Sequence, residues 1–155
     1  MRTNKVWAMA EVIQLQVALL RDGARLPARQ SEHASGFDLH ACLPGQTLEV
    51  GTMPVQVPTG IAIAAPSGVD VQIRPRSGLS ARGVMGTFGT IDADYRGELF
   101  VTLYCLPDVR SYLLQDGDRI AQLVIGRLAD VQWSVVPALD TTARGASGHG
   151  STGRA

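Results

Sequence analysis

The sequence contains little of what several specialised classes of protein require. Among its 155 residues there are 2 cysteines, aromatic residues make up 5%, and 14 basic residues balance 14 acidic ones. A balanced charge excludes the broad positive field that draws proteins to nucleic acids or anionic membranes. Any anion that this protein binds must therefore be held by a local group of side chains.

Cysteine clusters and long apolar runs are also absent. Cys42 and Cys105 stand far apart, without a CxxC pair or the cysteine-histidine spacing of a zinc site, so we expect two buried, reduced thiols. No window approaches the roughly 18 apolar residues of a membrane span. Glu11, Gln14 and Gln16 interrupt the run that could form a signal-peptide core. These absences predict a soluble, cytoplasmic protein.

Glycine and proline, 17 and 8 in number, divide the chain into short apolar runs. Apolar and polar residues alternate over 13–17, 69–74 and 131–135, and each of these segments predicts a half-buried strand. Turn sequences separate such runs at 43–45, 57–60, 66–68 and 115–118. Since 155 residues with 45% apolar content can hold one core, we expect a single all-β domain, a sandwich or jelly roll.

Only two segments could be helical. Ser77 to Gly83 predicts a short helix with Ser77 as its N-cap. Residues 6–20 have some helical spacing, but their second half alternates better as a strand.

The end of the chain differs in composition from the rest. From Asp140 to Ala155 no apolar residue is larger than alanine, so this segment cannot bury itself in a core. We predict a β domain over 1–139, with an N-terminal extension at 1–10, and a flexible tail over 140–155. The glycines, arginine and hydroxyls of the tail could wrap around phosphate oxygens and become ordered with the ligand, or the tail could simply be disordered.

Two neighbouring segments are the most informative about chemistry. They are Arg76-Ser77-Gly78-Leu79 and Ile91-Asp92-Ala93-Asp94-Tyr95-Arg96-Gly97-Glu98. Together they bring an arginine, a hydroxyl beside a glycine, two aspartates and an aromatic ring close in sequence. This set suits the binding of a phosphorylated nucleoside and the activation of water, and it indicates phosphate-ester chemistry.

Five segments, in this order, resemble the motifs of the trimeric dUTPase family. They are Ser35-Gly36-Phe37-Asp38-Leu39, Pro75-Arg76-Ser77-Gly78-Leu79, Gly89-Thr90-Ile91-Asp92-Ala93-Asp94-Tyr95-Arg96-Gly97, Gly117-Asp118-Arg119-Ile120-Ala121-Gln122-Leu123, and the tail from Arg144 to Gly153. The resemblance implies a jelly-roll homotrimer with active sites at its subunit interfaces. It also implies Mg²⁺-dependent hydrolysis of dUTP to dUMP and pyrophosphate, which limits uracil in DNA and supplies dUMP for dTTP synthesis.

The resemblance assigns both catalysis and recognition of the nucleoside to the motif at 89–97. Asp92 would orient and deprotonate the water that attacks the α-phosphorus, and Tyr95 would pack under the deoxyribose. The uracil would enter the hairpin that contains Gly89, Thr90 and Ile91. Phe100, on the returning strand, would lie opposite them and would also contact the uracil.

The resemblance assigns the phosphates to other motifs. Arg76 and Ser77, beside Gly78, would contact the α- and β-phosphates, and Gln122 would offer an amide to phosphate oxygens. Asp38 would face the Mg²⁺ through a metal-bound water. Asp118 and Arg119 are expected to form a structural pair.

The tail would complete the site. Arg144 would meet the γ-phosphate, and Gly150, Ser151 and Thr152 would bind the same end of the triphosphate. His149 stands where many relatives have phenylalanine and would stack on uracil, although a catalytic or metal-ligating histidine stays open.

The sequence also departs from the family pattern in the first motif and in the segment before the acidic motif. Phe37 replaces a common tyrosine, and Ser80 to Thr90 is short and lacks the asparagine that many relatives place beside the base. Two alternative functions also remain: a dCTP deaminase of related fold, and a non-catalytic nucleotide-binding regulatory module.

Overall fold

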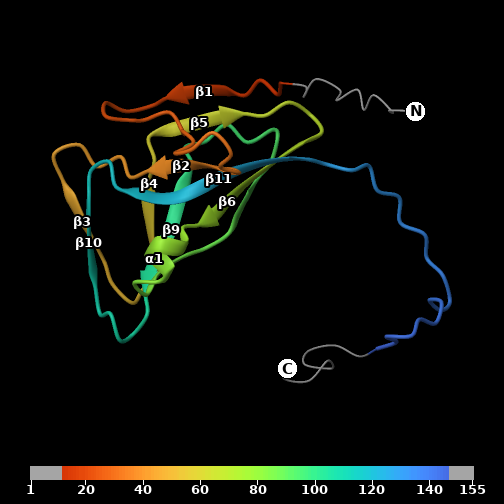
Figure 1. The fold of residues 1–155 in the computed structure, drawn as a ribbon. Helices are drawn as coiled ribbons and strands as arrows, with labels where there is room; N and C mark the ends of the chain where they lie inside the picture. Colours follow the sequence, from red (N-terminus) through yellow and green to blue (C-terminus); the bar gives the residue numbers. More distant parts are fainter. Residues whose placement is uncertain (1–11, 147–155) are drawn as a thin grey trace, which may run out of the picture.

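Short strands joined by tight turns form nearly all of the regular structure (Figure 1). The computed structural model describes residues 12–146. Its elements are β1 (Gln16–Leu19), β2 (Gly36–His40), β3 (Thr47–Val50), β4 (Val55–Pro58), β5 (Ile61–Ala64), β6 (Val69–Pro75), α1 (Ser77–Ser80), β7 (Val84–Gly86), β8 (Gly89–Ile91), β9 (Phe100–Cys105), β10 (Tyr112–Gln115) and β11 (Arg119–Arg127). The prediction of an all-β fold is confirmed. No helix in this part of the chain is long and apolar enough to cross a membrane.

The strands pair antiparallel in four small sheets. The largest has the order β2-β11-β6-β8, a second has the order β4-β9-β7, and two further pairs are β1-β5 and β10-β3. In the largest sheet Asp38, Gln122 and Arg74 occupy one row across three strands. Because side chains alternate between the two faces of a strand, this register places all three on the same face.

Strand β6 illustrates how the sequence pattern produces the core. Val69, Val71 and Ile73 are buried, while the polar residues between them occupy the opposite face. Similar inward-facing Val, Ile and Leu residues from the other strands complete one apolar cluster. Cys42 and Cys105 are both free and buried, as expected, and burial raises the pKa of each thiol.

The turn between β4 and β5 requires a glycine. Gly60 has a φ of 71°, in the left-handed region that other residues avoid. A Cβ at this position would lie 2.8 Å from both the Ala24 Cβ and the Cys42 Sγ. The turn therefore packs closely against the segment that follows β1.

The N-terminal strand is confirmed in its second half. Residues 16–19 form β1 and pair with β5, where Val17 faces Ile63. Ile13 and Leu15 also pack partly against the core without joining a strand. The predicted extension at 1–10 lies outside the described residues.

The helix is shorter than predicted, and its predicted cap is wrong. Helix α1 covers Ser77–Ser80, and its N-cap is Arg76, which makes no side-chain capping bond. Arg76 has extended backbone angles of φ -90 and ψ 126, so Ser77 is already the first helical residue. Turns follow the helix and end at Gly83, whose φ is 76°.

The predicted strand at 131–135 is also wrong for the single chain. Val131, Trp133 and Val135 are 64%, 91% and 97% exposed, and no strand of the described chain pairs with them. The reason is physical: a strand needs a neighbour for its backbone N–H and C=O groups.

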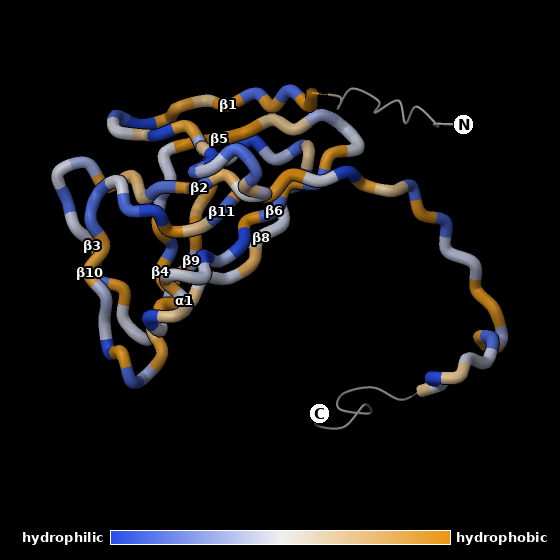
Figure 2. The backbone as a smooth tube through the Cα atoms, viewed as in Figure 1, coloured by the Kyte–Doolittle hydropathy of each residue, from blue (hydrophilic) through white to orange (hydrophobic). Residues whose placement is uncertain are grey.

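Just beyond β11, the Leu128 N–H donates to the Gly68 carbonyl at 3.0 Å. Beyond it the chain extends away as an arm, residues 129–146, which carries several hydrophobic stretches (Figures 1 and 2).

Candidate active site

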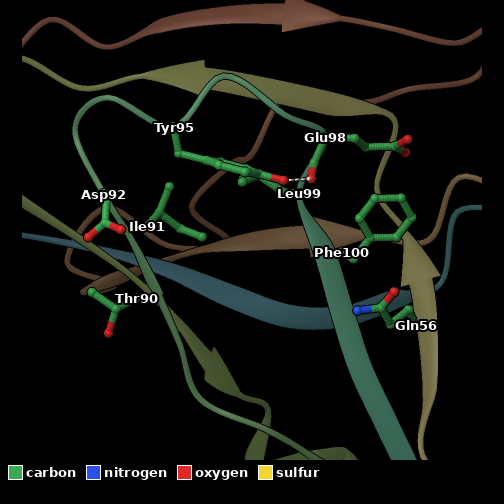
Figure 3. A pocket seen from close by; sticks show the side chains of 8 residues that line it. All are labelled: Gln56, Thr90, Ile91, Asp92, Tyr95, Glu98, Leu99 and Phe100. Atoms are coloured by element: carbon green, nitrogen blue, oxygen red, sulfur yellow. Dashed lines mark hydrogen bonds between the residues drawn. The ribbon is translucent and has the colours of Figure 1, made fainter.

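The acidic motif predicted to carry the chemistry borders a cavity of about 240 Å³ (Figure 3). It is lined by Gln56, Thr90, Ile91, Asp92, Tyr95, Glu98, Leu99 and Phe100. The structure thus brings together five of the residues that the sequence singled out. Gln56 and Leu99 were missed because they belong to none of the motifs, and Glu98, although it ends the acidic segment, was given no role in the site.

Asp92 lies at the rim of this cavity, just after β8 ends. Its side chain is exposed and makes no hydrogen bond or ion pair with the other described residues. The carboxylate is therefore available to accept a hydrogen bond from a water molecule in the cavity. Asp94 lies in the turn that follows, outside the lining of the cavity.

Tyr95 is held in a compact turn. Its N–H donates to the Asp92 carbonyl at 3.0 Å, and its hydroxyl donates to the Glu98 carbonyl at 3.0 Å. The Arg96 Nη1 donates to the Ala93 and Tyr95 carbonyls at 2.7 and 2.8 Å. These bonds fix the ring with one face toward the cavity (Figure 3).

Gly97 makes this position of the ring possible. A Cβ at residue 97 would collide with the Tyr95 hydroxyl oxygen and with the ring carbon that carries it. The glycine after Arg96 is therefore required by the packing of the tyrosine over the turn.

A second cavity, of about 270 Å³, is lined by Arg76, Gly78, Leu79, Arg82, Tyr112, Leu114, Asp118 and Arg119. It lies between α1, strand β10 and the start of β11. Three guanidinium groups line it, a composition that suits phosphate oxygens. Arg82 and Arg119 were not predicted as binding residues, since the first follows the motif and the second was assigned to a structural pair.

Asp38 organises the arginines of this region. It is 2% exposed, and its Oδ2 accepts a hydrogen bond from the Arg119 Nη1 at 3.2 Å. Its Oδ1 accepts from the Gln122 Nε2 at 3.2 Å and lies 3.6 Å from the Arg76 Nε. The Arg76 Nη1 also donates to the Arg119 carbonyl at 2.8 Å. A buried carboxylate thus fixes the Arg119 guanidinium together with the Arg76 guanidinium and the Gln122 amide, the two groups predicted to meet phosphate.

The expected pair of Asp118 and Arg119 is not formed. The Arg119 side chain turns to Asp38, while the Asp118 Oδ2 accepts the Gln115 N–H at 2.9 Å. The reason is local, because Asp118 lies in the tight turn before β11, where an Asp side chain readily accepts a nearby backbone N–H.

The two cavities lie apart in one chain. Ile91 faces Val71 across the β6-β8 pair, and Arg76 follows Val71 by five residues, about 16 Å at the rise of a strand. The chain therefore does not bring Asp92 together with Arg76.

The other predicted residues are placed as follows. Ser77 is exposed at the start of α1, and Gly89 faces Ile73 within the sheet. Arg144 lies in the arm. His149, Gly150, Ser151 and Thr152 fall outside the described residues.

His40, at the end of β2, is an unusual neighbour of this arginine cluster. Its Nδ1 is buried and has no hydrogen-bond partner among the described residues. Burial lowers the pKa of His40 below its ordinary 6.5, Arg25, Arg119 and Arg76 lower it further, and Asp38 opposes them. The folded protein thus favours the neutral imidazole.

This shift predicts a loss of stability in mild acid. The unfolded chain binds a proton near pH 6.5 and the folded chain at lower pH, so the free energy of unfolding should fall as the pH drops through and below 6.5. His40→Gln should remove much of this fall, measured by urea unfolding at several pH values. The exposed His33 provides the control, since His33→Gln should keep the wild-type pH dependence. An equal dependence in His40→Gln and the wild type would contradict the prediction.

Comparison with known proteins identifies the family. Residues 22–153 match the family model of dUTPase. The chain is 47% identical over 132 residues to the deoxyuridine 5'-triphosphate nucleotidohydrolase of Desulfotalea psychrophila, an alignment that covers 83% of this chain and 87% of that protein. It is 45% identical over 152 residues to the enzyme of the same name from Wolinella succinogenes, covering 94% and 99%.

Solved structures agree. A mutant dUTPase of Staphylococcus bacteriophage 80alpha, determined with dUpNHpp, superposes with a TM-score of 0.77 at 26% identity, covering 91% of this chain and 99% of that one. The resemblance seen in the five motifs is thereby confirmed, and this chain belongs to the dUTPase family of nucleotide hydrolases.

Proposed function

We propose that this protein hydrolyses dUTP to dUMP and pyrophosphate, with Asp92 activating the water that attacks the α-phosphorus. The observation that carries the proposal is the unpaired Asp92 carboxylate at the rim of a cavity that also contains the Tyr95 ring. A carboxylate in this position can orient a water and accept its proton, a contribution of about 100- to 10,000-fold in rate.

The same cavity would select the nucleoside. The Tyr95 ring would support the deoxyribose at a distance where a ribose 2′-hydroxyl is crowded. Backbone groups of Gly89, Thr90 and Ile91 would pair with the edge of uracil, with Phe100 on the far side. Cytosine presents a donor where uracil has its O4 acceptor, and the mismatch would cost about 1 to 3 kcal/mol.

The arginine-lined cavity would receive the phosphates. Arg76, next to Ser77 and Gly78, would balance their charge, and Gln122 would donate its amide. Asp38 would accept a further hydrogen bond from a Mg²⁺-bound water. A carboxylate has about four acceptor positions, and the hydrogen bonds from Arg119 and Gln122 occupy only two of them. Magnesium would supply charge neutralisation of the phosphate oxygens when bound. No group of three or more metal-ligating side chains occurs in residues 12–146.

A homotrimer with shared active sites explains the separation of the two cavities. One subunit would contribute Asp92 and Tyr95, and a neighbour would contribute Arg76 and Gln122. The exposed apolar arm would cover its side chains on another subunit, which would extend the β domain to residue 139. The tail from 140 would then bring Arg144, with His149, Gly150, Ser151 and Thr152, over the nucleotide.

The shared site predicts complementation between two defective variants. Asp92→Asn and Arg76→Gln should each be nearly inactive alone. Co-expressed in equal amounts, they should form mixed trimers with about a quarter of the wild-type activity, since one site in four then draws an intact residue from each contributing subunit. Separately purified variants mixed without subunit exchange are the control. If co-expression restores nothing, Asp92 and Arg76 do not meet across an interface.

A substrate panel tests the reaction. Pyrophosphate release should be measured with the four ordinary deoxynucleoside triphosphates, dUTP and UTP, with Mg²⁺ present. We expect release from dUTP far above the others. Ammonia from dCTP with dUTP left intact would instead identify a deaminase, and tight dUTP binding without pyrophosphate would identify a regulatory module.

A further inference from the structure

Glu98 lines the nucleoside cavity, yet its carboxylate is engaged elsewhere. The side chain is 12% exposed, and its Oε2 accepts hydrogen bonds from the Arg21 Nη2 at 2.6 Å and Nε at 3.2 Å. Its Oε1 accepts the Gly60 N–H at 2.9 Å. A carboxylate this far from water is tolerated only when it is paired and hydrogen-bonded, and Arg21 and Gly60 provide both conditions.

These contacts hold Glu98 against a rigid part of the fold. Gly60 lies in the tight turn between β4 and β5, and its carbonyl accepts the Leu20 N–H at 2.8 Å. Leu99, the residue after Glu98, donates its N–H to the Ile61 carbonyl at 2.8 Å, and its carbonyl accepts a hydrogen bond from the Thr59 hydroxyl at 2.6 Å. Glu98 is thus fixed through both its side chain and the backbone that follows it.

The backbone of Glu98 in turn fixes Tyr95. The Tyr95 hydroxyl donates to the Glu98 carbonyl, while the Glu98 carboxylate points away from the ring (Figure 3). Tyr95 is 43% exposed, so its ring has few other neighbours to restrain it. The position of the ring therefore depends on where the Glu98 carbonyl lies.

We propose that the ion pair of Arg21 with Glu98 is a positioning element that sets how strictly Tyr95 excludes ribonucleotides. This inference rests on the proposed function. A firmly held ring crowds a 2′-hydroxyl, whereas a ring that can tilt leaves room for it. Arg21 lies just after β1, far in sequence from the motif that it supports, and does not itself touch the cavity.

The test compares the ratio of kcat/KM for dUTP to that for UTP in the full-length protein. Arg21→Gln, which leaves the Glu98 carboxylate without a cation, should lower the ratio about 3- to 10-fold, the effect of losing roughly one hydrogen bond. Glu98→Gln keeps an acceptor for the Gly60 N–H but removes the charge, and it should lower the ratio by a similar factor. Arg21→Lys keeps the positive charge and should retain most of the wild-type ratio. Arg110→Gln removes one positive charge from an exposed loop and should leave the ratio unchanged.

A second background separates positioning from general stability. In Tyr95→Phe, which lacks the hydroxyl that reaches Glu98, Arg21→Gln should cause no further change in the ratio. The proposal is overturned if Arg21→Gln lowers only the Tm and leaves the ratio unchanged, or if it lowers the ratio equally in the Tyr95→Phe background. Failure of the proposed function would look different, since the wild-type protein would then not release pyrophosphate from dUTP.

Discussion

Replacing Asp92 with asparagine should reduce dUTP turnover by at least about 100-fold and leave nucleotide binding intact. The amide has nearly the same shape as the carboxylate but cannot accept a proton from water. The Asp92 side chain is exposed and makes no hydrogen bond or ion pair with the other described residues. The substitution should therefore leave the stability of the fold unchanged. Steady-state kinetics would measure the turnover, calorimetric titration with dUTP the nucleotide binding, and a thermal melt the stability of the fold.

Asp94→Asn is the matched control for this experiment. It removes an equal charge two residues away, from a side chain outside the cavity lining, and should keep most of the turnover. Turnover close to that of the wild type in Asp92→Asn would remove Asp92 from the mechanism.

Deleting the chain after Leu139 should leave a folded core and reduce kcat/KM for dUTP by at least about 100-fold, because several charged and backbone contacts to phosphate would be lost together. The described part of the deleted segment, 140–146, is exposed, and the Gly145 N–H donates within it to the Thr142 carbonyl at 3.0 Å and to the Thr142 Oγ1 at 3.2 Å. The core strands end at Arg127. The core should therefore not depend on the tail.

Circular dichroism and the melting temperature would report the core, and dUTP kinetics the site. A chain that ends at Gly153 is the control, since it loses only two residues beyond the glycine-rich motif and should stay active. An unfolded core after truncation at Leu139 would show that the tail is structural, and full activity would show that it does not reach the nucleotide.

What the sequence could predict depends on how far apart the interacting residues are. The alternation in β6 and the turn at Gln115 to Asp118 are local patterns, and the structure has both. The residues around Asp92 and Tyr95 share one cavity because nearly all of them belong to the continuous segment from Thr90 to Phe100.

Contacts between distant segments could not be predicted in this way. The bond between Arg119 and Asp38 joins residues 81 apart, and that between Arg21 and Glu98 joins residues 77 apart. The alternation at 131–135 is real, but nothing in a single sequence tells whether the partner of such a segment belongs to the same chain. The predicted strand was therefore wrong although its apolar pattern was read correctly.

The attack of an Asp92-activated water on the α-phosphorus is tested most directly by hydrolysing dUTP in ¹⁸O-labelled water and analysing both products by mass spectrometry. The predicted result is label in the phosphate of dUMP and none in pyrophosphate. Label in pyrophosphate would mean attack on the β-phosphorus and would contradict the proposed mechanism.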